Sequence, residues 1–159
     1  MSQRPALVWV ETPSNPLLRI VDIAAVAAAA HAVGALVVAD NTFLSPVWQQ
    51  PIALGADAVV HSTTKYLNGH SDVVGGAVIA ARPDLHERLA WWANCVGVTG
   101  APFDSYLTLR GLRTLHARMR AHGESTVQVV DLLAKHPAVR RVYYPGLPSH
   151  PGHEVARSQ

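Results

Sequence analysis

The chain has little charge and almost no cysteine. Asp, Glu, Lys and Arg together make up 15% of its 159 residues, and Cys95 is the single cysteine. One cysteine excludes an internal disulfide framework and suits a reducing cytoplasm. Because 49% of the residues are hydrophobic, we expect many segments to be buried on more than one side, within this chain or against another.

The chain also lacks long apolar runs and a large excess of either positive or negative charge. No run approaches the ~20 apolar residues that cross a bilayer, and the first residues lack the pattern of a signal peptide. The net charge of +2 is spread along the chain, which does not favour a nucleic-acid partner. The histidines near Lys65 and near the end of the chain have no zinc-ligand spacing. We therefore expect a cytoplasmic protein with no membrane, nucleic-acid or metal partner.

Four short apolar runs predict strands, at residues 6–11, 35–39, 57–61 and 75–80. Continuous apolar runs of this kind are typical of a parallel sheet that helices cover on both faces. Residues 22–33 are rich in alanine and predict a helix, with Asp22 placed to cap its start and Gly34 to end it. The fold class that these segments indicate is α/β, a mostly parallel sheet flanked by helices.

The pattern changes after Pro83. Helices are predicted at residues 84–92 and 103–135, and an apolar stripe runs along the second of these. Its arginines are interpreted as a solvated or subunit-facing flank rather than a surface for a polyanion. Residues 139–143 predict one more short strand, and a proline-rich loop follows.

Polar side chains follow several of the predicted strands. Asn15, Asp40 and the run Ser62-Thr63-Thr64-Lys65 occupy such positions. Loops at the carboxyl ends of parallel strands converge, so these side chains could share one site. A desolvated amine attacks carbonyls, a carboxylate pairs with a ring N–H, and hydroxyls bind phosphate. Pyridoxal 5′-phosphate presents the three matching groups, although it is not the only ligand that would.

Each of these residues also has a more ordinary interpretation. A lysine after a strand is usually a solvated loop residue, Asp40 could cap the turn at Asn41, and Asn15 between two prolines is by default a turn former. The Ser-Thr-Thr-Lys run lacks the Gly-x-x-x-x-Gly-Lys-Ser/Thr pattern, which leaves a small nucleotide-binding module without a supporting loop.

Three stretches resemble the Cys/Met-metabolism family of pyridoxal-phosphate enzymes in order and spacing. They are "ETPSNPLLRIVDIA", "VVADNTFLSPVWQQPIALGADAVVHSTTKYLNGHSDVVGGAVIA" and "WWANCVGVTGAPFDSYLTLRGLRTL". Together they extend over residues 11–115. The first two resemble the family at large, and the third is similar to its cystathionine γ-synthase branch.

The resemblance implies a role for each candidate residue. Lys65 would bind the cofactor aldehyde covalently and later move protons. Asp40 would pair with the protonated ring nitrogen. Ser62 and Thr64 match positions that hold the cofactor phosphate, and Asn15 matches one near the cofactor and the substrate carboxylate.

The implied reaction is γ-replacement: cysteine replaces the acyloxy group of an O-acylhomoserine to give cystathionine, a step of methionine biosynthesis. Cystathionine γ-lyase and O-acylhomoserine sulfhydrylase share this core and stay open as alternatives. Full members of the family are homo-oligomers. Their N-terminal phosphate loop and stacking tyrosine, and the carboxylate-binding arginine of their C-terminal domain, have no counterpart in this sequence. A non-catalytic remnant or assembly partner is therefore the alternative from another functional class.

The same resemblance implies two parts. Residues 1–136 would form a partial cofactor-binding large domain, of the pyridoxal-phosphate-dependent transferase fold. Residues 137–159 would form the truncated start of a C-terminal small domain.

Overall fold

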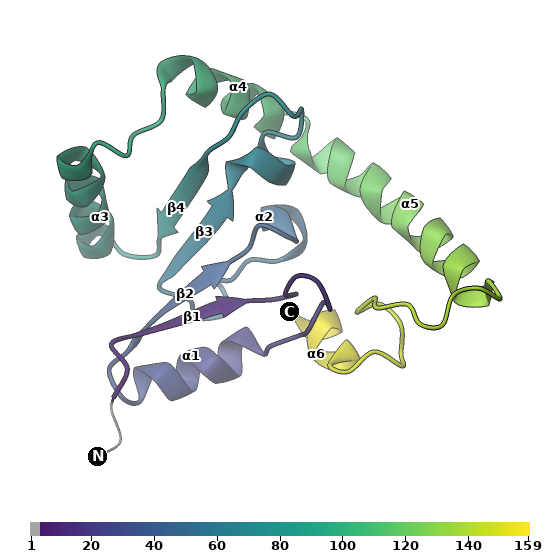
Figure 1. Ribbon diagram of the computed structural model, residues 1–159. Coiled ribbons are helices and arrows are strands. Elements are labelled where there is room, and N and C mark those ends of the chain that lie inside the picture. Colours follow the sequence, from purple (N-terminus) through teal and green to yellow (C-terminus); the bar gives the residue numbers. More distant parts are fainter. Residues whose placement is uncertain (1–3) are drawn as a thin grey trace.

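A four-stranded sheet lies at the centre of the computed structural model, which describes residues 4–159 (Figure 1). The strands lie side by side in chain order. β1, β2 and β3 run parallel, and β4 pairs with β3 in the antiparallel direction. Their bounds are β1 Leu7–Glu11, β2 Leu36–Asp40, β3 Ala58–Ser62 and β4 Gly76–Ala80. This architecture confirms the predicted α/β class with a mostly parallel sheet.

Helix α1, Ile23–His31, packs against β1 and β2. Its start is capped as predicted, because the Asp22 carboxylate accepts a hydrogen bond from the Ala25 N–H at 2.9 Å. Gly34 follows the helix with a φ of +78°, a left-handed conformation that glycine adopts without steric cost. Small side chains let the helix approach the strands closely. The buried cluster between them contains Val10, Ala27, Ala30, Ala35, Val37, Ala39 and Ala56.

The prediction of one continuous helix at residues 103–135 is wrong. The structure has two helices there, α4 Pro102–Leu112 and α5 Leu115–Lys135. Thr114 leaves the helical region, with φ −106° and ψ 0°. Its N–H and its hydroxyl both donate to the Gly111 carbonyl at 3.1 Å, so a side-chain hydrogen bond supplements the backbone bond at the break. A Cβ on Gly111 would overlap the Asn68 carbonyl, which shows how closely α4 approaches that loop.

The strand predicted at residues 139–143 is also wrong. This segment has no regular secondary structure, and the strand pairs of the described residues all lie within β1–β4. A short segment with β-branched and aromatic residues forms a strand only where a sheet edge can pair with it. The remaining helices are α2 Ser45–Trp48, α3 Pro83–Val96 and α6 His153–Ser158. The first part of α3 is the helix that the sequence predicts at 84–92.

The last residue of the chain returns to the start of α1. The Gln159 side chain accepts a hydrogen bond from the Ile23 N–H at 3.1 Å and donates one to the Val21 carbonyl at 3.0 Å. Figure 1 accordingly shows α6 and the C-terminus beside the loop that follows β1. The proposed division at residue 136 stays a prediction.

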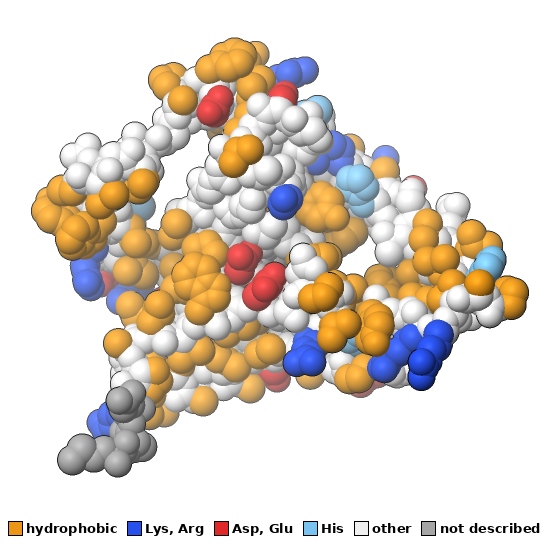
Figure 2. All heavy atoms as spheres, viewed as in Figure 1, with side chains coloured by type: hydrophobic (Ala, Val, Ile, Leu, Met, Phe, Trp, Pro, Cys, Tyr) orange, Lys and Arg blue, Asp and Glu red, His pale blue; other side chains and the backbone are white. Residues whose placement is uncertain are grey.

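Much apolar surface remains exposed. Helix α3 has no buried residue, and Trp91 and Trp92 on it are 59% and 57% exposed. Figure 2 shows hydrophobic side chains gathered at the left, where α3 lies in the same view. The expectation that apolar segments would be covered on several sides therefore holds for β2 and β3, whereas β1, β4 and α3 keep large apolar side chains exposed. Within residues 4–159, no helix is both long and apolar enough to cross a membrane.

A charged cluster ties the ends of three elements together on the side of the sheet away from the strand C-termini. The buried Asp57 carboxylate accepts hydrogen bonds from the Val37 N–H at 2.8 Å, from His31 Nε2 at 2.9 Å and from Arg82 Nη1 at 3.3 Å. Burial by itself raises the pKa of Asp57. The hydrogen bonds from His31 and Val37 and the charges of His31 and Arg82 outweigh burial, so the pKa is lowered.

We predict that Asp57→Asn lowers the free energy of unfolding by about 1–3 kcal/mol at pH 7, because it removes a buried charge-assisted acceptor. A lowered folded-state pKa contributes stability that is present above the unfolded value of about 4 and is lost as pH falls through the folded value. Urea unfolding of wild type and variant at pH 7 and pH 3 should therefore show a difference that shrinks in acid. The control is Asp84→Asn, whose side chain is 64% exposed. A loss from Asp57→Asn that is equal at both pH values would contradict this account.

Candidate functional site

Three parallel strands end at one edge of the sheet with a polar or acidic residue. Glu11, Asp40 and Ser62 are the last residues of β1, β2 and β3, and Glu11 and Asp40 are register partners. A cavity of about 1020 Å³ opens at this edge. It lies where ligands bind in open parallel sheets, outside the carboxyl ends of the strands.

All five residues that the sequence singles out line this one cavity: Asn15, Asp40, Ser62, Thr64 and Lys65. They come from three successive strand-to-helix connections, so their convergence follows from the parallel order of the strands. Further lining side chains come from the end of β1, the loop after β2, the Lys65 turn and α5. These include Glu11, Thr42, Phe43, Tyr66, Arg118 and His122.

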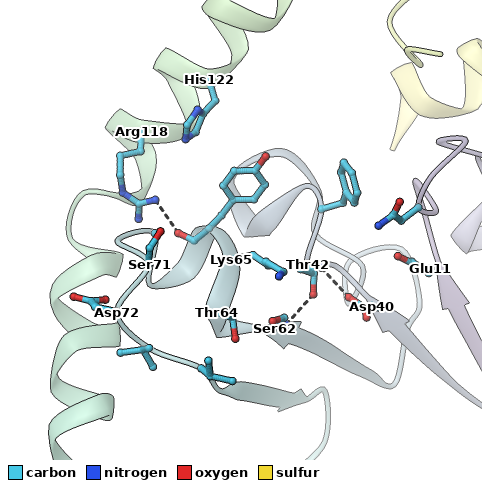
Figure 3. Close-up of a pocket in the computed structure, with 16 residues that line it drawn as sticks. Glu11, Asp40, Thr42, Ser62, Thr64, Lys65, Ser71, Asp72, Arg118 and His122 are labelled. Atoms are coloured by element: carbon cyan, nitrogen blue, oxygen red, sulfur yellow. Dashed lines mark hydrogen bonds between the residues drawn. The ribbon is translucent and has the colours of Figure 1, made fainter. Parts of the chain in front are cut away.

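Lys65 lies on η1, Thr63–Leu67, a π-helical turn that follows β3 directly. The backbone at Lys65 is not helical, with φ −88° and ψ −122°. In Figure 3 the Lys65 side chain reaches along the cavity toward the side on which Thr42 and Asp40 lie.

Thr42 connects two of the strand ends. Its N–H donates to Asp40 Oδ1 at 2.9 Å, and its hydroxyl oxygen accepts a hydrogen bond from the Ser62 N–H at 2.8 Å (Figure 3). Asp40 therefore closes a turn of the kind expected for an Asp before a polar loop, and it lines the cavity as well. The ordinary and the functional interpretations of Asp40 are compatible.

His61 lies on β3 just before Ser62 and is buried. Burial lowers the pKa of His61, while the Asp40 charge and a hydrogen bond to the Asn41 backbone oppose the shift. The imidazole is consequently neutral near pH 7, so His61 does not neutralise Asp40.

Thr64 joins the Lys65 turn to the loop before β4. Its hydroxyl oxygen accepts a hydrogen bond from the Gly75 N–H at 3.0 Å and donates to the Gly75 carbonyl at 3.3 Å. Asn15 lies on the exposed loop after β1. Among residues 4–159, no cluster of three His, Cys, Asp or Glu side chains is arranged to hold a metal ion.

Among the lining residues that sequence reasoning missed, two make hydrogen bonds that shape the site. Thr42 has no signal beyond its place in the loop after β2, since only the structure shows which N–H its hydroxyl meets. Arg118 belongs to the arginines interpreted as a solvated or subunit-facing flank, yet it lines the cavity and its guanidinium is hydrogen bonded to the turn that carries Lys65. Helical periodicity places Arg118 on α5 but does not show which loop it contacts.

Comparison with known proteins gives the same family over the whole chain. Residues 1–159 match the family described as Cys/Met metabolism PLP-dependent enzyme. Cystathionine gamma-synthase of Escherichia coli K12 is 58% identical over 159 residues, which are all of this chain and 41% of that protein. Cystathionine gamma-lyase of Dictyostelium discoideum is 51% identical over 158 residues, covering 99% of this chain and 41% of the relative.

A solved structure agrees closely with the fold. The cystathionine gamma synthase of Xanthomonas oryzae pv. oryzae, crystallised with aminoacrylate and cysteine, superposes with a TM-score of 0.97 at 61% identity. The match covers 98% of this chain and 40% of that one. The chain thus spans about two fifths of the length of the relatives it matches.

We predict that Thr42→Val costs about 1 kcal/mol of unfolding free energy, because the Ser62 N–H loses its acceptor. Thr42→Ser keeps the oxygen and should lose much less. Urea unfolding of the two variants measures the difference. If serine and valine destabilise equally, the hydroxyl bridge between the strand ends is not what Thr42 contributes.

Proposed function

The chain belongs to the Cys/Met metabolism family of pyridoxal-phosphate-dependent enzymes, and we propose that its cavity holds that cofactor through Lys65 and Asp40. The observation that supports this most is the convergence of an amine, a carboxylate and two hydroxyls from the ends of two neighbouring strands on one cavity. The donor set fits the cofactor group by group: Lys65 suits its aldehyde, Asp40 its ring nitrogen, and Ser62 and Thr64 its phosphate.

Asp40 would hold a proton on the ring nitrogen. It ends a strand at the cavity, its Oδ1 is fixed by the Thr42 N–H, and burial lowers the pKa of the neighbouring His61. A bound pyridoxal phosphate supplies an electron sink for charge that develops on a substrate carbon. A carboxylate that keeps the ring nitrogen protonated maintains that capacity.

Lys65 would hold the cofactor covalently and, once its amine is free, move protons between substrate carbons. The long side chain starts from a turn that sets its direction, which keeps the amine at the cavity while the rest of the turn stays packed. Ser62 and Thr64 would bind the phosphate with Asn15 nearby. The Thr64 hydroxyl already contacts Gly75, so Thr64 would also keep the Lys65 turn in place while the cofactor is bound.

For the whole protein we propose γ-replacement on an O-acylhomoserine by cysteine, which gives cystathionine. Synthase names belong to the relatives at 58% and 61% identity, and a lyase name to one at 51%. Because a lyase is this similar, cystathionine γ-elimination is the second candidate. A homo-oligomer in the cytoplasm, as the family resemblance and the single cysteine indicate, completes the proposal.

The chain has two lysines, Lys65 and Lys135, which provides a matched control. Lys135 is 73% exposed on α5 and pairs with Asp131 at 2.7 Å. Mixed with pyridoxal phosphate, wild type and Lys135→Ala should develop the visible absorption of the cofactor bound to a lysine, and Lys65→Ala should not. Absorption that survives in Lys65→Ala, or that never forms in wild type, would contradict the proposed site; the second outcome would favour the non-catalytic remnant.

The reaction is tested by supplying O-acylhomoserines, with succinyl, acetyl or phosphoryl groups in turn, together with cysteine and the cofactor. We expect cystathionine to accumulate faster than added cystathionine is broken down, because a synthase lowers the energy barrier for replacement more than that for elimination. Mass spectrometry of the products measures both rates. Breakdown without net formation would assign the lyase reaction instead.

A further inference from the structure

The guanidinium of Arg118 on α5 is hydrogen bonded to three parts of the structure around the Lys65 turn. Nη1 donates to the carbonyl of Tyr66 at 2.8 Å (Figure 3), Nη2 to the carbonyl of Gly111 at 2.9 Å and Nε to the Thr114 hydroxyl at 3.0 Å. The Arg118 side chain thereby joins η1 to the break between α4 and α5. Tyr66 is the residue immediately after Lys65, so one contact fixes the backbone next to the proposed cofactor lysine.

The Lys65 turn needs such a contact from outside. Because the backbone at Lys65 is not helical, the regular ladder of the turn is interrupted there. Carbonyls near an interruption require partners from elsewhere in the fold. Arg118 meets that requirement at Tyr66 with a charged donor, which makes a stronger hydrogen bond than a neutral one.

The loop after the turn is shaped around the guanidinium. Gly69 has a φ of +75°, and a Cβ at this position would overlap the Arg118 side chain. His122, one helical turn further along α5, places its ring 5.5 Å from that of Tyr66. Helix α5 therefore contacts Tyr66 at both its backbone and its ring.

An anion-binding role fits Arg118 less well, although it lines the cavity. Donors on all three of its side-chain nitrogens are directed at protein acceptors in different directions. Burial lowers the pKa of Arg118, but a guanidinium starts from so high a value that it stays charged. The Arg118 guanidinium is therefore a charged group whose nitrogens donate hydrogen bonds to the protein itself.

We propose that Arg118 is a positioning residue that holds the backbone of the Lys65 turn so that the lysine amine points into the cavity. This inference rests on the proposed function for the role of the amine, but the holding of the turn does not depend on the cofactor. Arg118 would act through Tyr66 and would not contact the reacting atoms.

The first test is hydrogen exchange of residues 63–69 in the full chain without cofactor. We expect Arg118→Met to speed exchange there about tenfold or more, since a charge-assisted hydrogen bond is lost. Gly69→Ala should act in the same direction by displacing the guanidinium. The matched control is Arg120→Met, on the same helix with a side chain 74% exposed, which should leave these amides unchanged.

The variant Ile23→Ala distinguishes a local effect of Arg118→Met on the Lys65 turn from a loss of stability in the whole chain. Ile23 is fully buried on α1, away from the cavity, and its truncation should destabilise the whole chain. If exchange at residues 63–69 in Arg118→Met equals that in Arg120→Met, or only follows global stability as in Ile23→Ala, the positioning role is overturned.

The second test adds pyridoxal phosphate and follows the visible absorption against pH. Arg118→Met should weaken cofactor binding about tenfold or more and move the pH midpoint of the absorption, and Arg118→Lys should restore part of both because one donor can still reach the Tyr66 carbonyl. An unchanged affinity and midpoint in Arg118→Met would contradict the proposal. Wild type without absorption would refute the proposed function alone, and the exchange experiment would still decide the role of Arg118.

Discussion

The parallel pairing of β1, β2 and β3 is the constraint on which the rest of the structure depends. Parallel strands point their carboxyl ends the same way, so Glu11, Asp40 and Ser62 finish side by side. Helix α1 packs small alanine side chains closely against one face of β1 and β2, which holds the strands in this arrangement. The cavity, the turn that carries Lys65 and the bridge through Thr42 all follow from that shared edge.

Sequence reasoning worked where local pattern and topology agree. Apolar runs predicted the four strands, Asp22 and Gly34 marked both ends of α1, and the rule for parallel strand ends brought five scattered polar residues to one cavity. It failed where contacts outside the apolar pattern decide. Residues 139–143 pair with no strand, and the helical stretch breaks at Thr114, which apolar periodicity does not register. Arg118 was missed because its contact with Tyr66 joins residues far apart in the sequence.

The exposed apolar surface is the physical counterpart of the composition. A chain with 49% hydrophobic and 15% charged residues has too few charged side chains to form its whole surface, so apolar side chains remain exposed. The buried clusters lie beneath β1 and β2 and between η1 and α5, whereas α3 is left open.

The central claim is that one amine, fixed at the shared strand edge, binds an aldehyde. Borohydride reduction of the protein mixed with pyridoxal phosphate, followed by peptide mapping, tests it most directly, because reduction makes the link permanent. The account predicts the modification on the peptide that contains Lys65, at one equivalent, with Lys135 unmodified. Modification spread over both lysines and the N-terminal amine, or concentrated on Lys135, would contradict it.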